Sequence, residues 1–447
     1  MNTIQQSRAT SYPTVQKPAA TPGSNDRVVR LALHLGLTSA VLTTWLHVKP
    51  RTRGLASNLL GYGLKIVSGA TAPILAATGL ASALLTDRRR FLRSLPGWIG
   101  TLLGLRFIWQ VCSHADPVAL PDQTRSPSSS KCIEALKSAK LPPPVHRSAR
   151  MTRNLTFATV PSSRHPGSGR PLLCDLWEPG PGVARSGLGI IYLHGGAWQS
   201  FDKDVMTRRF FRHLAAQGHV VMDVAYRMVR ETDMHGMLGD VKRAIAWLKG
   251  HSATLGVDPT RVVLAGGSAG GHLALLAGYT PNSPEFDPSD TRDGDTSACA
   301  VIAFYPVADL RTLSDHWSEQ AMHPLATALG RIMGFFPPEG YLPWTRLAEG
   351  LFGSPLDRVS DALLAYSPIA HVDPNCPPTL ILQGLHDHVI PVEDVFALHK
   401  ALVTAGNTAT LVSLPMVEHA FDMLPLRISP PTRVAYRAID SFLAQLS

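Results

Sequence analysis

The chain has 447 residues, of which 45% are hydrophobic and 17% are charged, and its mean hydropathy is +0.05. This composition excludes an intrinsically disordered chain, a collagen and a coiled coil. The length exceeds that of a usual single domain, so we expect one large core with an additional region. The five cysteines are widely spaced and form no C-x-x-C pair, which indicates neither a disulfide framework nor a zinc site.

The positive charge is concentrated at one end of the chain. The formal net charge is +9, yet residues 1–150 hold 19 Lys and Arg against 5 Asp and Glu, so the remainder is mildly acidic. A uniformly basic protein would indicate nucleic-acid binding, whereas a basic, apolar N-terminal third indicates attraction to anionic lipid headgroups. We therefore expect membrane lipid as a partner and no nucleic acid.

Residues 1–27 are rich in Ser, Thr, Pro and Gln, which predicts a disordered tail rather than a signal peptide. Three apolar runs follow, Leu31–Val48, Ile66–Leu85 and Leu95–Cys112, and they predict a helical membrane-anchor region over residues 28–112. The second run is uncharged and long enough to span about 30 Å of hydrocarbon. Helices that pack on one another or lie in the membrane interface are the alternative to true spanning.

Basic residues flank the second apolar run on both sides, with Lys65 before it and Arg88, Arg89 and Arg90 after it. Because both flanks are positive, the positive-inside rule does not choose an orientation. We expect association with an intracellular membrane such as the endoplasmic reticulum. Clusters of Pro and Ser then predict a linker over residues 113–150.

After residue 150, short β-rich runs alternate with helical patterns. The predicted strands are Gly189–His194, His219–Val224, Arg261–Ala265, Ala300–Phe304 and Thr379–Gln383. Near-continuous apolar strands separated by helices imply a parallel sheet that is covered on both faces. Residues 151–447 are therefore predicted to form an α/β domain with a mostly parallel, doubly wound sheet.

The segment Gly266–Gly270 reads G-G-S-A-G, follows a predicted strand directly and opens a helix. This strand, turn and helix context is what a nucleophile elbow requires, because the glycines relieve the crowding of a sharp turn and leave the hydroxyl of Ser268 exposed. A phosphate-binding loop is the alternative for such a glycine-rich turn. The lysine of a P-loop and the G-x-G-x-x-G fingerprint are both missing, which disfavours it.

A second motif, His194-Gly-Gly-Ala-Trp198, ends another predicted strand about 70 residues before Ser268. Glycines at such a strand end let backbone N–H groups approach a developing oxyanion. Here the chain resembles the α/β-hydrolase superfamily, and within it the serine carboxylesterases with an H-G-G-x-W signature, which are hormone-sensitive-lipase-like. The resemblance covers about residues 151–447 and none of the N-terminal third. It implies an oxyanion hole at Gly195, Gly196, Ala197 and Ala269, with Trp198 binding substrate.

In that superfamily the chain order is nucleophile, acid, histidine, and two later segments fit it. Asp387 lies in a match to G-x-x-D-x-x-V/I-P after one predicted strand, and His419 lies in a match to H-x-F after the next β-like run. A serine hydroxyl is a poor nucleophile at neutral pH, so it needs an adjacent base, and that base needs an acid to hold its tautomer. The resemblance therefore implies a catalytic triad of Ser268, His419 and Asp387.

Other polar residues near these motifs have plainer interpretations. His386 and His388 flank Asp387, which makes a metal site conceivable, but no further ligand cluster supports one, and we expect neither a metal nor a cofactor. Glu418 is expected to be a solvated loop charge and His272 a structural or pocket residue. The resemblance implies that four further residues brace the sheet and a neighbouring helix through polar contacts: Asp223, Tyr226, Arg227 and Asp240.

About 119 residues separate Ser268 from Asp387, more than one strand and one helix require. The excess, about residues 311–355, is rich in large apolar residues, and the resemblance implies that an insertion at this place is a cap over the active site, which we expect to line it for an acyl or polyketide-like group. Ordinary helix core is the alternative.

Together these features predict a serine hydrolase that cleaves a carboxylic ester of an apolar small molecule through an acyl-enzyme. If an alcohol or amine replaced water, the same acyl-enzyme would give acyl transfer, lactonisation or cyclisation, and the sequence does not separate these. A non-catalytic ligand-binding homologue is disfavoured because no triad residue is lost. Since every catalytic candidate lies after residue 190, the N-terminal third is expected to be dispensable for chemistry.

Overall fold

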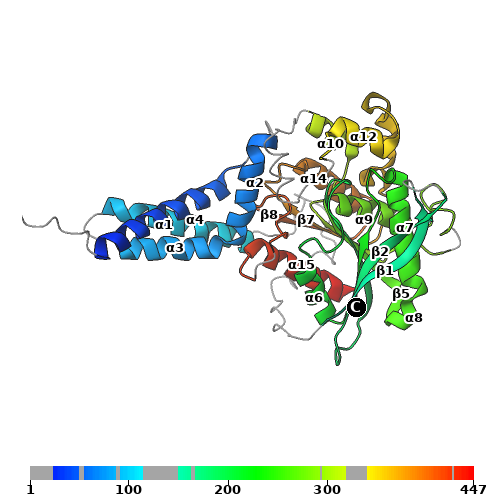
Figure 1. Ribbon diagram of the computed structural model, residues 1–447, viewed down its shortest axis with the longest axis horizontal. Coiled ribbons are helices and arrows are strands. Elements are labelled where there is room, and N and C mark those ends of the chain that lie inside the picture. The colour runs from blue at the N-terminus through cyan, green and yellow to red at the C-terminus, as the bar shows by residue number, and fades with distance from the viewer. Residues whose placement is uncertain are drawn as a thin grey trace, which may run out of the picture.

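The computed structural model describes residues 24–49, 55–86, 91–113, 149–162, 167–291, 294–318, 340–424 and 427–446. Four N-terminal helices precede an α/β domain, and three of them project from that domain as a rod (Figure 1). The predicted tail lies outside the described residues up to residue 23, and so does the predicted linker from 114 to 148.

The N-terminal helices are α1 (Ser24–His47), α2 (Leu55–Ala70), α3 (Ala72–Leu85) and α4 (Phe91–Ser113). The run Ile66–Leu85, which is expected to be long enough to span a bilayer as a helix, is divided between α2 and α3, which are bent by 76° at the break between Ala70 and Ala72. Pro73 stands in the first turn of α3, where the missing proline N–H costs no hydrogen bond, and so favours a new helix there.

One helix among the described residues, Arg27–His47, is long and apolar enough to cross a membrane. The bent pair α2 and α3 would add a second such segment if the two helices formed one span. By length and composition, Arg27–His47 fits either a membrane anchor or a signal sequence.

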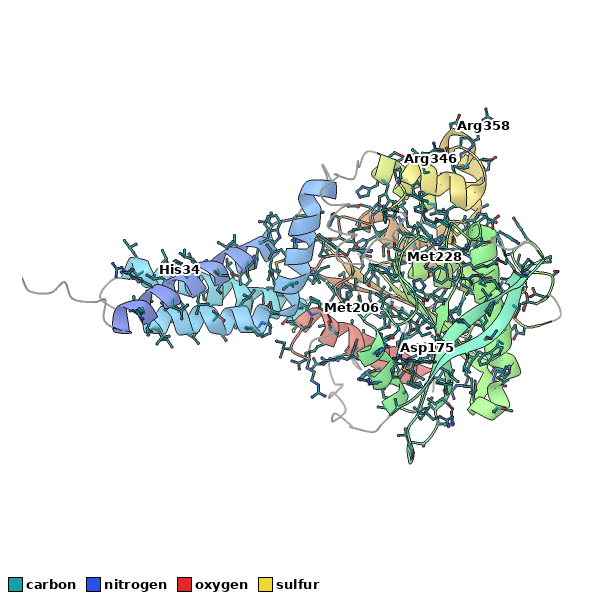
Figure 2. All side chains as sticks on the ribbon, viewed as in Figure 1. His34, Asp175, Met206, Met228, Arg346 and Arg358 are labelled. Carbon is teal, nitrogen blue, oxygen red and sulfur yellow. The ribbon has the colours of Figure 1, made fainter. Side chains whose placement is uncertain are left out.

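The rod formed by α1, α3 and α4 has small residues inside and large apolar residues outside. A Cβ atom on Gly97 would lie 2.6 Å from the carbonyl oxygen of Gly79, so these two helices cross at backbone contact. The hydroxyl of Ser39 donates to the carbonyl of Leu75 on the neighbouring helix. Of the 23 large apolar side chains exposed among the described residues, 17 lie on these three helices. Figure 2 shows side chains projecting along the rod, where the exposed His34 is labelled.

The α/β domain is built on an eight-stranded sheet in the order β1-β2-β4-β3-β5-β6-β7-β8. Its strands are β1 (Arg150–Pro161), β2 (Gly169–Glu178), β3 (Gly187–Leu193), β4 (Val220–Ala225), β5 (Val257–Gly267), β6 (Ala300–Phe304), β7 (Thr379–Gly384) and β8 (Ala409–Leu414). β1 and β2 pair in antiparallel fashion, and β4, β3 and β5 to β8 are parallel. The predicted mostly parallel α/β sheet is therefore confirmed, and β1 and β2 are two strands that sequence analysis did not identify.

Helices cover both faces of the sheet, as near-continuous apolar strands require. One face carries α7 (Met234–Gly250), α9 (Ala269–Tyr279) and α14 (Val392–Thr404). The other face carries α6 (Arg208–Ala216) and α15 (Pro430–Gln445). Successive residues of β3 alternate between these two cores, because side chains of a strand point to opposite faces in turn. Leu46, Phe107 and Val111 of the N-terminal helices join the second core.

The predicted cap region is described in part, because residues 319–339 lie outside the described residues together with much of the apolar stripe. The described part includes α10 (Leu310–Ser318) and α12 (Trp344–Phe352), which lie together at one end of the domain (Figure 1). The short helices η1 (Leu356–Arg358), α13 (Ser360–Ala365) and η2 (Pro368–His371) follow. The amide of Gln199 exchanges two hydrogen bonds with the backbone of Leu342, which ties this region to the H-G-G-x-W segment.

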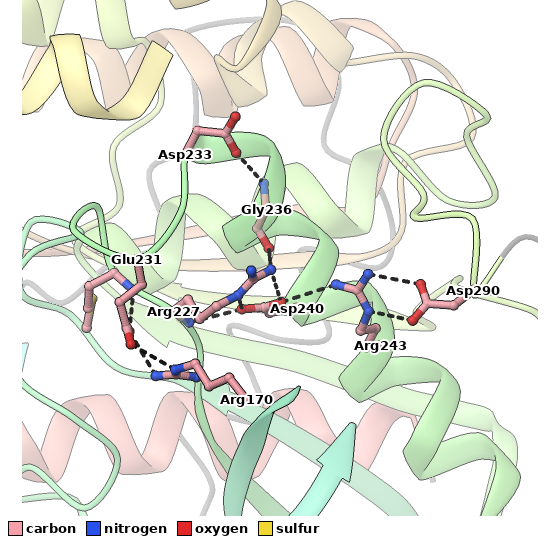
Figure 3. Close-up of polar contacts among 9 residues, drawn as sticks. Arg170, Arg227, Glu231, Asp233, Gly236, Asp240, Arg243 and Asp290 are labelled. Atoms are coloured by element: carbon pink, nitrogen blue, oxygen red, sulfur yellow. Dashed lines mark hydrogen bonds and ion pairs between the residues drawn. The ribbon is translucent and has the colours of Figure 1, made fainter. Parts of the chain in front are cut away.

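Two of the residues expected to brace the sheet, Arg227 and Asp240, lie in a network of polar contacts (Figure 3). The fully buried carboxylate of Asp240 on α7 accepts two hydrogen bonds of 2.8 Å from the guanidinium of Arg227. The hydroxyl of Tyr226 donates to the carbonyl of His194 at 2.8 Å, and the carboxylate of Asp223 accepts from the N–H of Asp204. These contacts fix the strand ends around the H-G-G-x-W segment.

Candidate active site

Ser268 lies on the turn between β5 and α9, with φ 56° and ψ −120°. A residue other than glycine rarely adopts a positive φ, so the surrounding packing must hold the serine there. A Cβ atom on Gly270 would lie 2.1 Å from the carbonyl oxygen of Leu193, which explains why this turn needs glycine. The N–H of Ser268 donates to the carbonyl of Phe304 on β6. The turn therefore presents the hydroxyl at the carboxyl edge of the sheet.

The structure brings the three predicted triad residues together. The hydroxyl of Ser268 lies 3.1 Å from Nε2 of His419, and Nδ1 of the same ring lies 2.8 Å from Oδ2 of Asp387. The bond to Asp387 assigns the ring proton to Nδ1 and leaves Nε2 to accept the serine proton. Asp387 and His419 are both almost fully buried. This is the geometry that a serine nucleophile, a base and an orienting acid require.

Asp387 belongs to the acid loop, residues 385–391, which connects β7 to α14. Its Oδ1 accepts hydrogen bonds from the N–H groups of Val389 and Ile390, both at 2.9 Å. Its Oδ2 accepts from the amide of Gln383 at 3.0 Å, in addition to the bond from His419. With four donors around it, the carboxylate is held in one orientation.

The H-G-G-x-W segment lies against the elbow. A Cβ atom on Gly195 would lie 3.4 Å from the Cβ of Ser268, and one on Gly196 would lie 1.9 Å from the carbonyl oxygen of Ser200. Ala197 and Trp198 follow with φ 51° and 58°. Within the described part of the chain, no hydrogen bond is found from the N–H of Gly196 or Ala197. Ala269 begins α9, where helix N–H groups lack partners within the helix.

Trp198 is predicted to bind substrate, and that role stays a prediction. Its side chain is 0% exposed and packs edge-on against His272, with ring centroids 5.2 Å apart. Trp317 of α10 contacts Trp198 on one side and Trp344 of α12 on the other. These three tryptophans join the H-G-G-x-W segment to the described helices of the cap region.

His272 occupies a buried position behind the elbow, as expected of a structural residue. Its Nε2 donates to the carbonyl of Tyr366 at 2.8 Å. Burial lowers the pKa of the ring to about 4, so His272 is neutral at physiological pH.

Glu418 corrects an expectation, because it is 2% exposed rather than solvated. It lies in the histidine loop, residues 415–421, which follows β8. Its Oε1 accepts hydrogen bonds from the backbone N–H of His388 at 3.0 Å and of His419 at 2.9 Å. Adjacent side chains on a loop rarely face one another, but a carboxylate reaches a neighbouring backbone N–H easily.

Sequence analysis did not identify Tyr305 and Asp422, which form a hydrogen-bonded pair beside His419. The ring of Tyr305, at the end of β6, lies 4.4 Å from the ring of His419, and its hydroxyl donates to Asp422. Burial raises the pKa of the Asp422 carboxyl. Tyr305 has a positive φ of 37°, and its position directly after a predicted strand at the same edge as Ser268 was the available signal.

The described residues contain no group of three His, Cys, Asp or Glu side chains placed to hold a metal ion. Around Asp387, His386 and His388 instead contact residues of α2.

Comparison with known families decides where the fold belongs. The BD-FAE family model matches residues 175–402, which include both Ser268 and Asp387 and make up just over half of the chain. The chain belongs to the BD-FAE family. It is thus a member of the α/β-hydrolase superfamily and resembles its hormone-sensitive-lipase-like esterases, as the motifs predict. The N-terminal helices lie outside the matched range.

Two curated relatives come from Mycobacterium tuberculosis. The chain is 30% identical over 280 residues to "Probable carboxylic ester hydrolase LipM", an alignment that covers 62% of this chain and 59% of that protein. It is also 30% identical over 307 residues to "Esterase LipQ", covering 68% of this chain and 64% of the relative. The chain thus spans about three fifths of the length of these relatives.

Among solved structures, the apo form of Thermogutta terrifontis esterase 2 superposes with a TM-score of 0.51 at 25% identity, covering 69% of this chain and 98% of that one. The same esterase phosphonylated by sarin superposes with a TM-score of 0.50 at 25% identity, covering 68% and 97%. The α/β domain therefore has the fold of a known esterase.

Proposed function

We propose that this chain is a serine carboxylesterase that cleaves a carboxylic ester of an apolar small molecule through an acyl-enzyme. The observation that carries the proposal is the continuous hydrogen-bonded path from Ser268 through His419 to Asp387, with distances of 3.1 and 2.8 Å. A serine on a strained turn beside a base and a held acid is the arrangement that activates a hydroxyl.

In the proposed mechanism the oxygen of Ser268 attacks the ester carbonyl while Nε2 of His419 takes the hydroxyl proton. Asp387 holds the imidazolium that forms. The N–H groups of Gly196, Ala197 and Ala269 stabilise the tetrahedral oxyanion, with Gly195 shaping the loop that carries the first two. Collapse of the intermediate expels the alcohol, which His419 protonates, and a water molecule then repeats the sequence on the acyl-enzyme. This path needs no cofactor.

The names of the relatives favour hydrolysis over acyl transfer, lactonisation or cyclisation. LipM and LipQ are named as an ester hydrolase and an esterase. The esterase from Thermogutta terrifontis reacts with sarin, an electrophile that phosphonylates it. That the substrate is apolar rests on the sequence of the predicted cap region, which is rich in large apolar residues.

A fluorophosphonate probe tests the proposed nucleophile directly. We expect the full-length protein to be labelled stoichiometrically and Ser268→Ala to take up no label. Loss of a triad serine costs on the order of 10⁶ in kcat, so turnover of a short ester should vanish while the unfolding temperature stays unchanged. Retained turnover above about 1% of wild type would contradict the assignment.

We also propose that α1, α3 and α4 anchor the enzyme in a lipid bilayer. Their large apolar side chains face outward and their small ones inward, which is the packing of membrane helices and unlike that of a soluble monomer. Residues 31–47 of α1 carry no Lys, Arg, Asp or Glu over about 26 Å, close to the thickness of the hydrocarbon layer. The same features suit any bilayer, and nothing in the described residues favours the endoplasmic reticulum.

Cations lie at both ends of this apolar band. Arg27 and Arg30 stand at the start of α1, Arg93 at the start of α4, and Lys49 just after α1. The exposed Arg106 lies about 10 Å before the end of α4, from where a long side chain reaches the headgroup layer.

Carbonate washing tests the anchor. We expect the full-length protein to stay in the membrane pellet, because insertion of helices of this length is effectively irreversible. Leu92→Asn with Leu102→Asn should shift the protein toward the soluble fraction. Leu364→Asn with Ile428→Asn is the matched control, because these exposed apolar residues lie on the α/β domain. Release of the wild type by carbonate would refute the anchor.

A further inference from the structure

The two sequence neighbours of Asp387 both contact α2. Nζ of Lys65 donates to Nδ1 of His386 at 2.8 Å. The ring of Tyr62 meets the ring of His388 edge-on, with centroids 5.2 Å apart. Burial and then the positive charge of Lys65 lower the pKa of His386 to about 3, so its ring is neutral and accepts the hydrogen bond. Helix α2 therefore contacts the acid loop on both sides of Asp387, the proposed triad acid.

The acid loop and the histidine loop are joined by a single carboxylate oxygen. Oε1 of Glu418 accepts from the N–H of His388 and from the N–H of His419. Glu418 thus holds the backbone of both His388, which follows the proposed acid, and His419, the proposed base. Because Glu418 is buried, its charge is costly unless a positive group compensates it.

Lys65, which is also 2% exposed, supplies part of that compensation from α2 by attracting the Glu418 carboxylate electrostatically. Nδ1 of His388 lies 3.0 Å from Oε1 of the same carboxylate. Lys65 and Glu418 both line one gap of about 10 Å³ between the N-terminal helices and the histidine loop, which is at the lower limit for holding a water molecule. Lys65 also donates to the carbonyl of Val48 at the end of α1, so the charge is fixed to two N-terminal helices.

We infer that α2 is a positioning element for the active site, and that Tyr62 and Lys65 keep Asp387 and His419 aligned with Ser268. This inference rests on the proposed function. Neither residue touches the reacting atoms, so both act through the loops. The N-terminal region is then part of the working enzyme as well as its anchor.

A positioning role predicts a loss in kcat rather than in KM. Misplacement of a catalytic group by about 1 Å costs up to about 100-fold in rate, whereas substrate binding in the cap region is untouched. A residue that served only the folding of α2 would instead change the amount of folded protein and leave the kcat of the folded fraction unchanged.

The first experiment uses the full-length protein in detergent micelles with a short ester. We expect Tyr62→Ala to lower kcat about 10- to 100-fold with KM unchanged within about twofold. Tyr62→Phe should retain wild-type kcat, because it keeps the ring that meets His388. Leu64→Ala is the matched control on the same helix, since the Leu64 side chain is 40% exposed.

The second experiment is a double-mutant cycle between Lys65 and Glu418, which removes little packing volume. Lys65→Met removes the positive charge of Lys65 from the buried surroundings of the Glu418 carboxylate and should lower kcat about 10-fold. Glu418→Gln keeps one oxygen for the two N–H groups and should cost less. The double variant should recover part of the loss of Lys65→Met, because the buried negative charge is gone. This cycle decides the question even if Tyr62→Ala does not fold.

Two results would overturn the inference: wild-type kcat in both Tyr62→Ala and Lys65→Met, or strictly additive effects of Lys65→Met and Glu418→Gln. Fluorophosphonate labelling separates these results from a failure of the proposed function. If the wild type neither labels nor hydrolyses esters, the function itself is wrong. If it does both while the α2 variants match it, only the positioning role falls.

Discussion

The rod of N-terminal helices and the α/β domain are packed in opposite ways. In the rod, small residues such as Gly79 and Gly97 meet at backbone contact and large apolar side chains such as Leu102, 64% exposed, face outward. In the α/β domain, Ile191 and Leu193 are buried and few large apolar residues are exposed. The proposed membrane anchor would account for this difference, because helices in lipid gain nothing by hiding apolar surface and associate through close contact instead.

The junction between the rod and the α/β domain is packed in neither of these two ways. There Lys65 of α2, a buried cation, donates to His386 and lines the same small gap as Glu418, a buried carboxylate. Charged groups at a buried contact specify one docking geometry, because any other arrangement leaves a charge without its partner. The polar contacts at this junction therefore help to determine how the N-terminal helices dock on the α/β domain.

The largest effect is expected when the N-terminal helices are removed from the α/β domain. A chain that begins at Arg150 should lose activity by about 10³-fold or more, approaching the effect of losing the triad acid, because both loops lose their contacts with α2. The readout is ester turnover per labelled serine, measured on folded protein. Full activity of this shortened chain would instead support the expectation from the sequence that the N-terminal third is dispensable for chemistry.

Gly196→Ala tests the α/β domain, and Gly97→Ala in the rod is its counterpart. Gly196→Ala places a Cβ atom 1.9 Å from the carbonyl oxygen of Ser200 at a positive φ of 118°. The loop must shift, and displacing an oxyanion donor costs about 10² to 10³ in kcat. Steady-state kinetics should show this loss with fluorophosphonate labelling slowed in parallel. Unchanged kcat would place the oxyanion hole elsewhere.

Acid should destabilise the α/β domain through its buried neutral histidines. Burial lowers the pKa of His272 and of His219 to about 4, below the usual unfolded value of about 6.5. Protons therefore bind the unfolded chain first, so the stabilisation is complete above pH 6.5 and is lost as the pH falls toward 4.

Each of these histidines should cost about 2 kcal/mol between pH 8 and pH 5. Denaturant unfolding of the full-length protein at the two pH values measures the difference. His272→Gln keeps a donor for the carbonyl of Tyr366 but does not titrate, so its unfolding free energy should depend less on pH. An equal pH dependence in this variant would contradict the assignment.

The smallest effect is expected for Gly97→Ala in the rod, the counterpart of Gly196→Ala. Gly97→Ala places a Cβ atom 2.6 Å from the carbonyl of Gly79, which forces α3 and α4 apart and should cost about 1–3 kcal/mol of rod stability. We expect no change in kcat in micelles, because Gly97 contacts neither loop. Proteolysis of the rod in detergent, compared between wild type and variant, measures the effect. A loss of kcat equal to that of Gly196→Ala would erase the distinction between the two regions.

The sequence by itself determined the mostly parallel sheet and the residues that meet at its edge. Ser268, Asp387 and His419 each follow a strand within a short motif, and parallel strands bring their carboxyl ends to the same edge of a sheet. Their catalytic roles stay predictions. The apolar runs likewise predicted the N-terminal helices, because the spacing of apolar residues is a local property.

Only the tertiary structure decided the rest. The 76° bend made two helices of Ile66–Leu85, and Glu418, expected in solvent, became the buried link between two loops. Lys65 reaches His386 across 321 positions of sequence. No local pattern encodes such a contact, because it depends on how two separately patterned regions dock and on which charges that docking removes from water.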